Sequence, residues 1–96
     1  MHVLALEFDI HVPTSRSLKE KRAAIRPVID GIRHRYPVAV AETDHQGKWQ
    51  RAGVGIAAVS DSVSHAESVI DDVERFVWSF PELEVVGTAR RWMEQD

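Results

Sequence analysis

Three side chains that can bind a metal ion or transfer a proton occupy alternate positions near the N-terminus: Glu7, Asp9 and His11. In an extended strand, residues two apart point to the same face, so these three would share one surface. Two carboxylates and an imidazole could ligate a divalent cation or act as a general acid–base pair. The structural interpretation, which we favour, is a cross-strand ion pair in which Arg51 neutralises the carboxylates.

The rest of the chain lacks the motifs of the major catalytic classes. It has no nucleophile elbow, no HExxH and no glycine-rich phosphate loop, because Gly53 and Gly55 fall inside a predicted strand. The other histidines have no metal-ligand spacing, and the absence of cysteine excludes disulfides and thiolate chemistry. We therefore assign no catalytic residue, no cofactor and no metal site, and we do not expect an enzyme.

The strongest charge asymmetry is a basic segment at residues 16–35. It holds seven Lys/Arg residues and two acids, a local net charge of +5 in a chain whose net charge is −3. At 3.6 residues per turn, four of its cations would share one flank of a helix: Lys19, Arg22, Arg26 and Arg33. Such a row could contact the phosphates of RNA, or it could be a solvated face whose long side chains cover the edge of the core. The pI of about 5.9 argues against strong non-specific nucleic-acid binding.

Six elements are predicted to position these residues. The patterns are period-two alternation for strands, apolar residues three and four apart for helices, and a capping box at Ser17 and Glu20. Pro27 lies inside the first helix and predicts a kink there. The predicted segments are a strand at 2–12, a helix from Ser17 towards Pro37, strands at 38–44 and 49–60 joined by a loop at 45–48, a helix from 61–62 to Pro81, and a strand at 84–93.

The order β-α-β-β-α-β predicts an α+β fold, the ferredoxin-like sandwich. Right-handed crossovers give a four-stranded antiparallel sheet of order 4-1-3-2 with both helices on one face. The 96 residues are enough for one domain, 1–96. The first and third strands then run side by side, which brings Arg51 near Glu7 and Asp9. The residues expected at the centre of the core are Leu6, Phe8, Ile29, Val54, Val73 and Phe76.

The helix-free face of the sheet is the second candidate surface. Its expected lining consists of small and apolar residues: Val3, Ala5, Ala39, Ala41, Gly53, Gly55 and Ala57. These side chains are too small to stack on bases as the aromatic residues of RNA-binding sheets do. A flat apolar patch suggests a partner, and we expect self-association through this face. Trp49 would then cover the hairpin or an interface.

Several of these segments together resemble the YlxP-like bacterial family, a domain family of unknown function. They are the run Ser17 to Arg22 after His11-Val12-Pro13, the strand Val38 to Glu42, the turn Asp44-His45-Gln46, the run Trp49 to Ala52, the strand Gly55 to Ser60, and His65. The resemblance covers most of residues 3–80 and departs from the family pattern at Pro27 and Thr43. It implies a ferredoxin-like fold. It also implies a role near RNA or the ribosome, because genes of the family sit among genes for transcription elongation and translation initiation. It supplies no catalytic residue.

Two functions of different classes follow from these observations. The first is a non-enzymatic accessory protein that binds RNA or a ribosome-associated protein through the basic helix. The second is an assembly module that forms a homo-oligomer through the open sheet face and has no nucleic-acid role. A small metal- or ligand-dependent enzyme is a third alternative. No apolar run approaches the length of a membrane span, so we expect no membrane partner and a cytoplasmic location.

Overall fold

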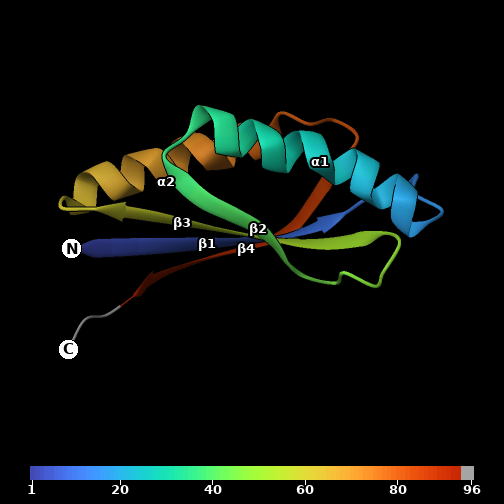
Figure 1. The fold of residues 1–96 in the computed structure, drawn as a ribbon, viewed down its shortest axis with the longest axis horizontal. Coiled ribbons are helices and arrows are strands. Elements are labelled where there is room, and N and C mark those ends of the chain that lie inside the picture. The colour runs from blue at the N-terminus through green and yellow to red at the C-terminus, as the bar shows by residue number, and fades with distance from the viewer. Residues whose placement is uncertain (94–96) are drawn as a thin grey trace.

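Both helices lie on one face of a four-stranded antiparallel sheet (Figure 1). The structure is a computed structural model and describes residues 1–93. The strands are ordered β2-β3-β1-β4, which confirms the predicted topology and the ferredoxin-like fold. The elements are β1 (His2–His11), α1 (Leu18–Arg35), β2 (Val38–Asp44), β3 (Arg51–Ser60), α2 (Val63–Trp78) and β4 (Glu84–Met93). Among residues 1–93, no helix is long and apolar enough to cross a bilayer.

Strand β1 lies between β3 and β4 in the sheet, and its side chains alternate between two environments. Leu4, Leu6, Phe8 and Ile10 are buried beneath the helices, whereas Glu7 faces solvent. The strand pairs with β3 as an antiparallel neighbour, and Ala5 lies opposite Ala57. This alternation fixes the register, since a one-residue slip would carry every apolar side chain to the open face.

The first turn of α1 is capped as predicted, with one difference. The backbone N–H of Glu20 donates to Ser17 Oγ at 3.1 Å. The Glu20 carboxylate accepts from the backbone N–H of Arg16 at 2.7 Å, one residue before the capping serine. The helix then continues through Pro27 to Arg35. Pro27 and Ala23 are both exposed, so water can reach the carbonyl that the proline leaves without its usual donor.

The hairpin between β2 and β3 departs from the prediction in its extent and its shape. Strand β3 begins at Arg51, so Trp49 lies in the loop and not in the strand. The pairing of β2 with β3 shifts register between Glu42 and Asp44. A Cβ atom at Gly55 would lie 2.7 Å from Thr43 Cγ2, and one at Gly53 would lie 2.7 Å from Asp44 Cβ. The two glycines therefore make room for the irregular end of β2 and do not leave the sheet bare.

The predicted core is right for four residues and wrong for two. Leu6, Phe8, Val54 and Val73 are buried, whereas Ile29 and Phe76 are only partly buried and pack at its margin. Phe76 lies where the helices meet, and a Cβ atom at Gly31 would be 2.5 Å from its Cζ. Its ring packs edge to face with Phe80 at 5.2 Å and lies 4.8 Å from the Arg35 guanidinium. Helical spacing gave the correct face of Phe76 but not its depth.

Strand β4 is held to α2 by a charged side chain as well as by its pairing with β1. Arg90 lies 2.7 Å from Asp71 and 3.1 Å from Glu74. Partial burial acts to lower the pKa of Arg90, but hydrogen bonds and charge from Asp71 and then Glu74 outweigh it and raise that pKa. Arg90 therefore stays fully charged and ties this edge of the sheet to the helical layer.

The depth difference between two phenylalanines gives a stability prediction. We expect Phe8→Ala, at a side chain that is 1% exposed, to lower the free energy of unfolding by about 3–5 kcal/mol. We expect a smaller loss, about 2 kcal/mol, for Phe76→Ala, because its ring keeps contact with solvent. Urea denaturation of both variants measures this. Equal losses would contradict the marginal position of Phe76.

Candidate functional site

Three of the four predicted cations form an exposed flank on α1. Lys19, Arg22 and Arg26 are all solvent-exposed, and none of them makes an ion pair within residues 1–93. Their spacing of three and four residues places them on neighbouring turns. We call these three residues the basic flank. Their charges are free to meet anionic groups from outside the chain.

The fourth predicted cation, Arg33, is engaged within the protein. Its Nη1 lies 3.4 Å from the carboxylate of Asp30, and its Nη2 donates to the carbonyl of Val40 on β2 at 3.4 Å. These contacts direct the Arg33 side chain towards β2, at the edge of the sheet. The predicted row of four is therefore a cluster of three plus one residue that bridges α1 and β2.

A shallow groove runs beside the basic flank, between α1 and β2. Its volume is about 230 Å³, and its walls are Arg22, Ile25, Arg26, Ile29, Asp30 and Glu42. Two arginines and two apolar side chains line it together with two acids. The groove is thus mixed in charge, and its cations belong to the flank already described.

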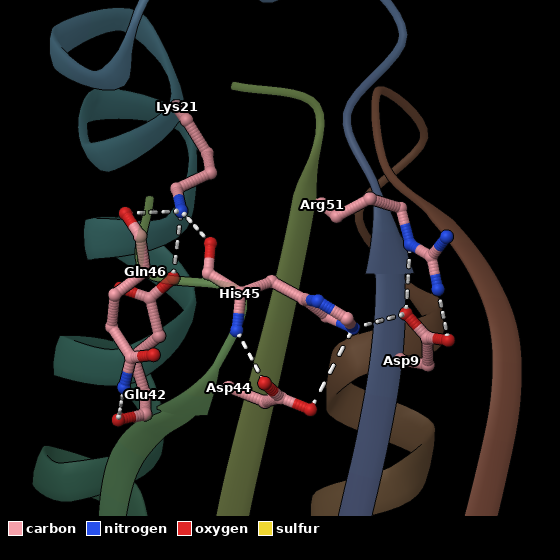
Figure 2. Close-up of polar contacts among 7 residues, drawn as sticks. All are labelled: Asp9, Lys21, Glu42, Asp44, His45, Gln46 and Arg51. Carbon is pink, nitrogen blue, oxygen red and sulfur yellow. Dashed lines mark hydrogen bonds and ion pairs between the residues drawn. The ribbon is translucent and has the colours of Figure 1, made fainter. Parts of the chain in front are cut away.

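Lys21, in the same basic segment, is a structural residue and not a surface cation. Its side chain is 1% exposed and points from α1 into the β2–β3 loop (Figure 2). Nζ donates to the carbonyls of His45 at 2.8 Å and Gln46 at 3.3 Å. It also lies 3.0 Å from Glu42 Oε2, an ion pair by distance although its alignment is not that of a hydrogen bond. We call these contacts the Lys21 clamp.

Lys21 was missed by sequence reasoning, yet a signal was present. It occupies a core-facing position of α1, in line with the buried residues Ile25, Val28 and Ile32. A lysine at such a position must find partners inside the protein, because a buried unpaired ammonium is strongly unfavourable. The motif around Ser17 thus combines a cap, a clamp and exposed cations.

His45 lies at the centre of the loop that the clamp holds. Its φ of 60° is the left-handed conformation, and its backbone N–H donates to Asp44 Oδ1 at 2.8 Å. The ring lies between two carboxylates, with Nε2 3.8 Å from Asp44 Oδ2 and 3.9 Å from Asp9 Oδ1 (Figure 2). Gln46 continues the loop and donates from Nε2 to the Glu42 carbonyl at 3.3 Å.

The candidate triad on β1 separates into three different environments. Asp9 accepts two contacts from Arg51, from Nε at 3.0 Å and from Nη2 (Figure 2). This confirms the predicted cross-strand ion pair for Asp9, while Glu7 forms none in residues 1–93. His11 Nδ1 lies 3.1 Å from the Glu84 carboxylate on β4. No three His, Cys, Asp or Glu side chains of the described part converge in a geometry that could hold a metal ion.

The open sheet face carries a depression of about 430 Å³. Five of the predicted interface residues line it, namely Ala5, Ala39, Ala41, Gly55 and Ala57, with Glu7 and Thr43 among the others. Gly53 lies apart, in a polar hollow beside Asp9, Asp44 and His45. Val3 lies beyond the depression, opposite Val59, which is 61% exposed. Small residues do gather on this face as predicted.

The fold defines a ferredoxin-like α+β domain. The chain matches the family model described as "Protein of unknown function (DUF503)" over residues 3–90, and it belongs to that family. It is similar to the uncharacterized protein YlxP of Bacillus subtilis (strain 168). The two are 40% identical over 76 residues, which cover 79% of this chain and 83% of that protein. The sequence resemblance is thereby confirmed.

Solved structures show the same architecture at low sequence identity. The designed protein Foldit4 matches with a TM-score of 0.54 and 15% identity, over 98% of this chain and 99% of that one. A designed protein with ferredoxin fold, LFR1 1, also has a TM-score of 0.54 at 18% identity, over 97% and 84%. A C-terminal segment of the alpha subunit of aIF2 from Pyrococcus abyssi has a TM-score of 0.50 at 20% identity, over 98% and 50%. These matches support the fold alone.

The Lys21 clamp gives a prediction about stability. Lys21→Met removes the ammonium group that lies 3.0 Å from Glu42 Oε2 and leaves two loop carbonyls without this donor. We expect a loss of about 3 kcal/mol, at the lower end for a broken buried pair because Glu42 keeps 21% side-chain exposure. We expect Lys21→Met/Glu42→Leu to lose less than Lys21→Met alone, since no carboxylate is then left unpaired.

Urea denaturation measures both variants, and Lys19→Met is the matched control. Lys19 lies two residues away on the exposed flank, so its replacement should change stability by no more than about 0.5 kcal/mol. If Lys21→Met were as harmless as Lys19→Met, the clamp would have no stabilising role.

Proposed function

We propose that this protein is a non-enzymatic accessory protein that binds RNA, acting in the cytoplasm, and that the basic flank of α1 contacts the RNA phosphates. The observation that carries the proposal is that Lys19, Arg22 and Arg26 stay exposed and form no ion pair within residues 1–93 of an acidic protein. Exposed arginines bind phosphate through paired N–H donors, and lysine binds it as a point charge.

The contrast with other cations of the chain supports this proposal. Arg33, Arg51, Arg75 and Arg90 each pair with at least one acid. Lys21 is buried in its clamp. The three residues of the basic flank are instead a same-sign group on neighbouring turns of one helix, an arrangement that costs repulsion unless an anion is bound. RNA is the polyanion that the family's gene neighbourhood suggests.

The proposal is tested by the salt dependence of RNA binding. We expect the affinity to fall steeply with salt, and we expect Arg22→Ala/Arg26→Ala to reduce the slope of log K against log salt by roughly 1.4 to 2. Folding should stay intact, because exposed charges contribute little to stability. Binding of ribosomal RNA fragments measured at several salt concentrations gives both quantities.

A matched control removes the same charge elsewhere. Arg75→Ala/Arg91→Ala takes two exposed arginines from α2 and β4. It should leave the salt slope close to that of the parent if α1 is the contact surface. Equal weakening by both double variants would mean that only net charge matters, and absence of binding by the parent at low salt would reject the RNA proposal.

Self-association through the open sheet face is the second candidate function. The depression lined by Ala5, Ala41 and Ala57 favours it, because small side chains allow two sheets to approach closely. The substitution Ala41→Glu tests it better than Gly55→Glu, since a side chain at Gly55 would collide with Thr43 and disturb the fold.

Light scattering of the parent at high micromolar concentration measures the oligomeric state. We expect a homodimer for the parent and a monomer for Ala41→Glu, because the new carboxylate would be buried without a partner. A monomeric parent would reject the assembly function.

A further inference from the structure

Trp49 is a large aromatic side chain that the fold leaves more than half exposed. It is 57% exposed, and its ring pairs with no aromatic ring or cation of residues 1–93. The sequence suggested that Trp49 covers the hairpin or an interface, and this exposure favours an interface. Exposing so much aromatic surface to water is unfavourable, which makes Trp49 a candidate for contact with something outside the chain.

The loop that carries Trp49 is held in place on both sides. Gln50 Nε2 donates to the carbonyls of Pro13 at 3.2 Å and Ser15 at 3.1 Å. On the other side, the Lys21 clamp fixes the carbonyls of His45 and Gln46 (Figure 2). A ring on a fixed loop loses little conformational freedom when a ligand binds. The entropic cost of binding is therefore small, and the ring's contacts with the ligand contribute more fully to the affinity.

The loop between β2 and β3, which carries Trp49, lies at the end of the molecule where α1 begins (Figure 1). Lys48 precedes it in the loop, and Gln50 contacts the residue just before Arg16. Lys48 and Arg16 are both exposed and make no ion pair within the described residues. The same loop is clamped to α1 between Lys19 and Arg22, two residues of the basic flank. A flat ring among unpaired cations suits a ligand that has both flat rings and phosphates.

We propose that Trp49 is a stacking platform for an unpaired base of single-stranded RNA. The phosphates of this RNA would then lie near Lys48, Arg16 and the N-terminal end of α1. The proposal rests on the proposed RNA function and narrows it to single strands, because bases in a duplex do not expose their faces for stacking. A base stacked on an aromatic side chain contributes affinity that does not depend on sequence or on salt. The basic flank supplies the salt-dependent part.

The test separates stacking from charge. The experiment measures the binding of two probes, an unstructured oligoribonucleotide and a probe of the same length with abasic sites. Each probe is tested with the parent, Trp49→Ala, Trp49→Phe and Trp78→Ala. We expect Trp49→Ala to weaken binding of the intact oligonucleotide about 5- to 150-fold, the range for one lost stacking contact, with the salt slope unchanged. Trp49→Phe should recover part of the loss. Trp78, 58% exposed at the end of α2, is the control and should have no effect.

The abasic probe gives the decisive comparison. The parent should bind it more weakly than the intact oligonucleotide, and Trp49→Ala should bind both alike. If Trp49→Ala binds the intact oligonucleotide as tightly as the parent, stacking is rejected while the salt-dependent binding to α1 stands. Preference of the parent for a duplex over the single strand would also reject it. If the parent shows no salt-dependent binding to any RNA, both proposals fall.

Discussion

The Lys21 clamp is the interaction on which the placement of α1 against the β2–β3 loop depends. The buried ammonium group of Lys21 joins α1 to the loop between β2 and β3, two segments that lie far apart in the sequence. It satisfies two loop carbonyls and faces the Glu42 carboxylate at 3.0 Å. Because an unpaired charge in that position is strongly unfavourable, the helix and the loop keep one relative placement. The exposed flank of α1 and the loop bearing Trp49 therefore form one rigid surface.

The sheet contributes to this surface from its other face. Asp9 receives Arg51 from β3, and the ring of His45 lies between Asp9 and Asp44 (Figure 2). The loop is thus bordered by Lys21 on the helical side and by Asp9 on the open side. Of the residues that first suggested metal or acid–base chemistry, only Asp9 supports the hairpin, whereas His11 contacts Glu84 on β4.

The fold was predictable from sequence because its signals are local and mutually consistent. Alternation in β1 and β3 determined which side chains face the helices, and the capping serine located the start of α1. The errors concern features that depend on three-dimensional closeness. The burial of Phe76 depends on how closely α2 approaches Gly31, and the covering of Gly53 and Gly55 depends on a register shift in β2. The burial of Lys21 could be predicted from its place in line with the buried apolar residues of α1, but its partners in the β2–β3 loop could not.

The contacts of Arg33 and Gln46 have a consequence for how the sheet can grow. Strand β2 is a terminal strand, and such a strand offers unpaired carbonyls to any passing extended chain. Here the Val40 carbonyl is occupied by Arg33 and the Glu42 carbonyl by Gln46. An incoming strand would have to displace both side chains before it could pair. The protein's own side chains thus hinder the addition of a further strand at this edge, and the register shift between Glu42 and Asp44 interrupts the regular ladder there.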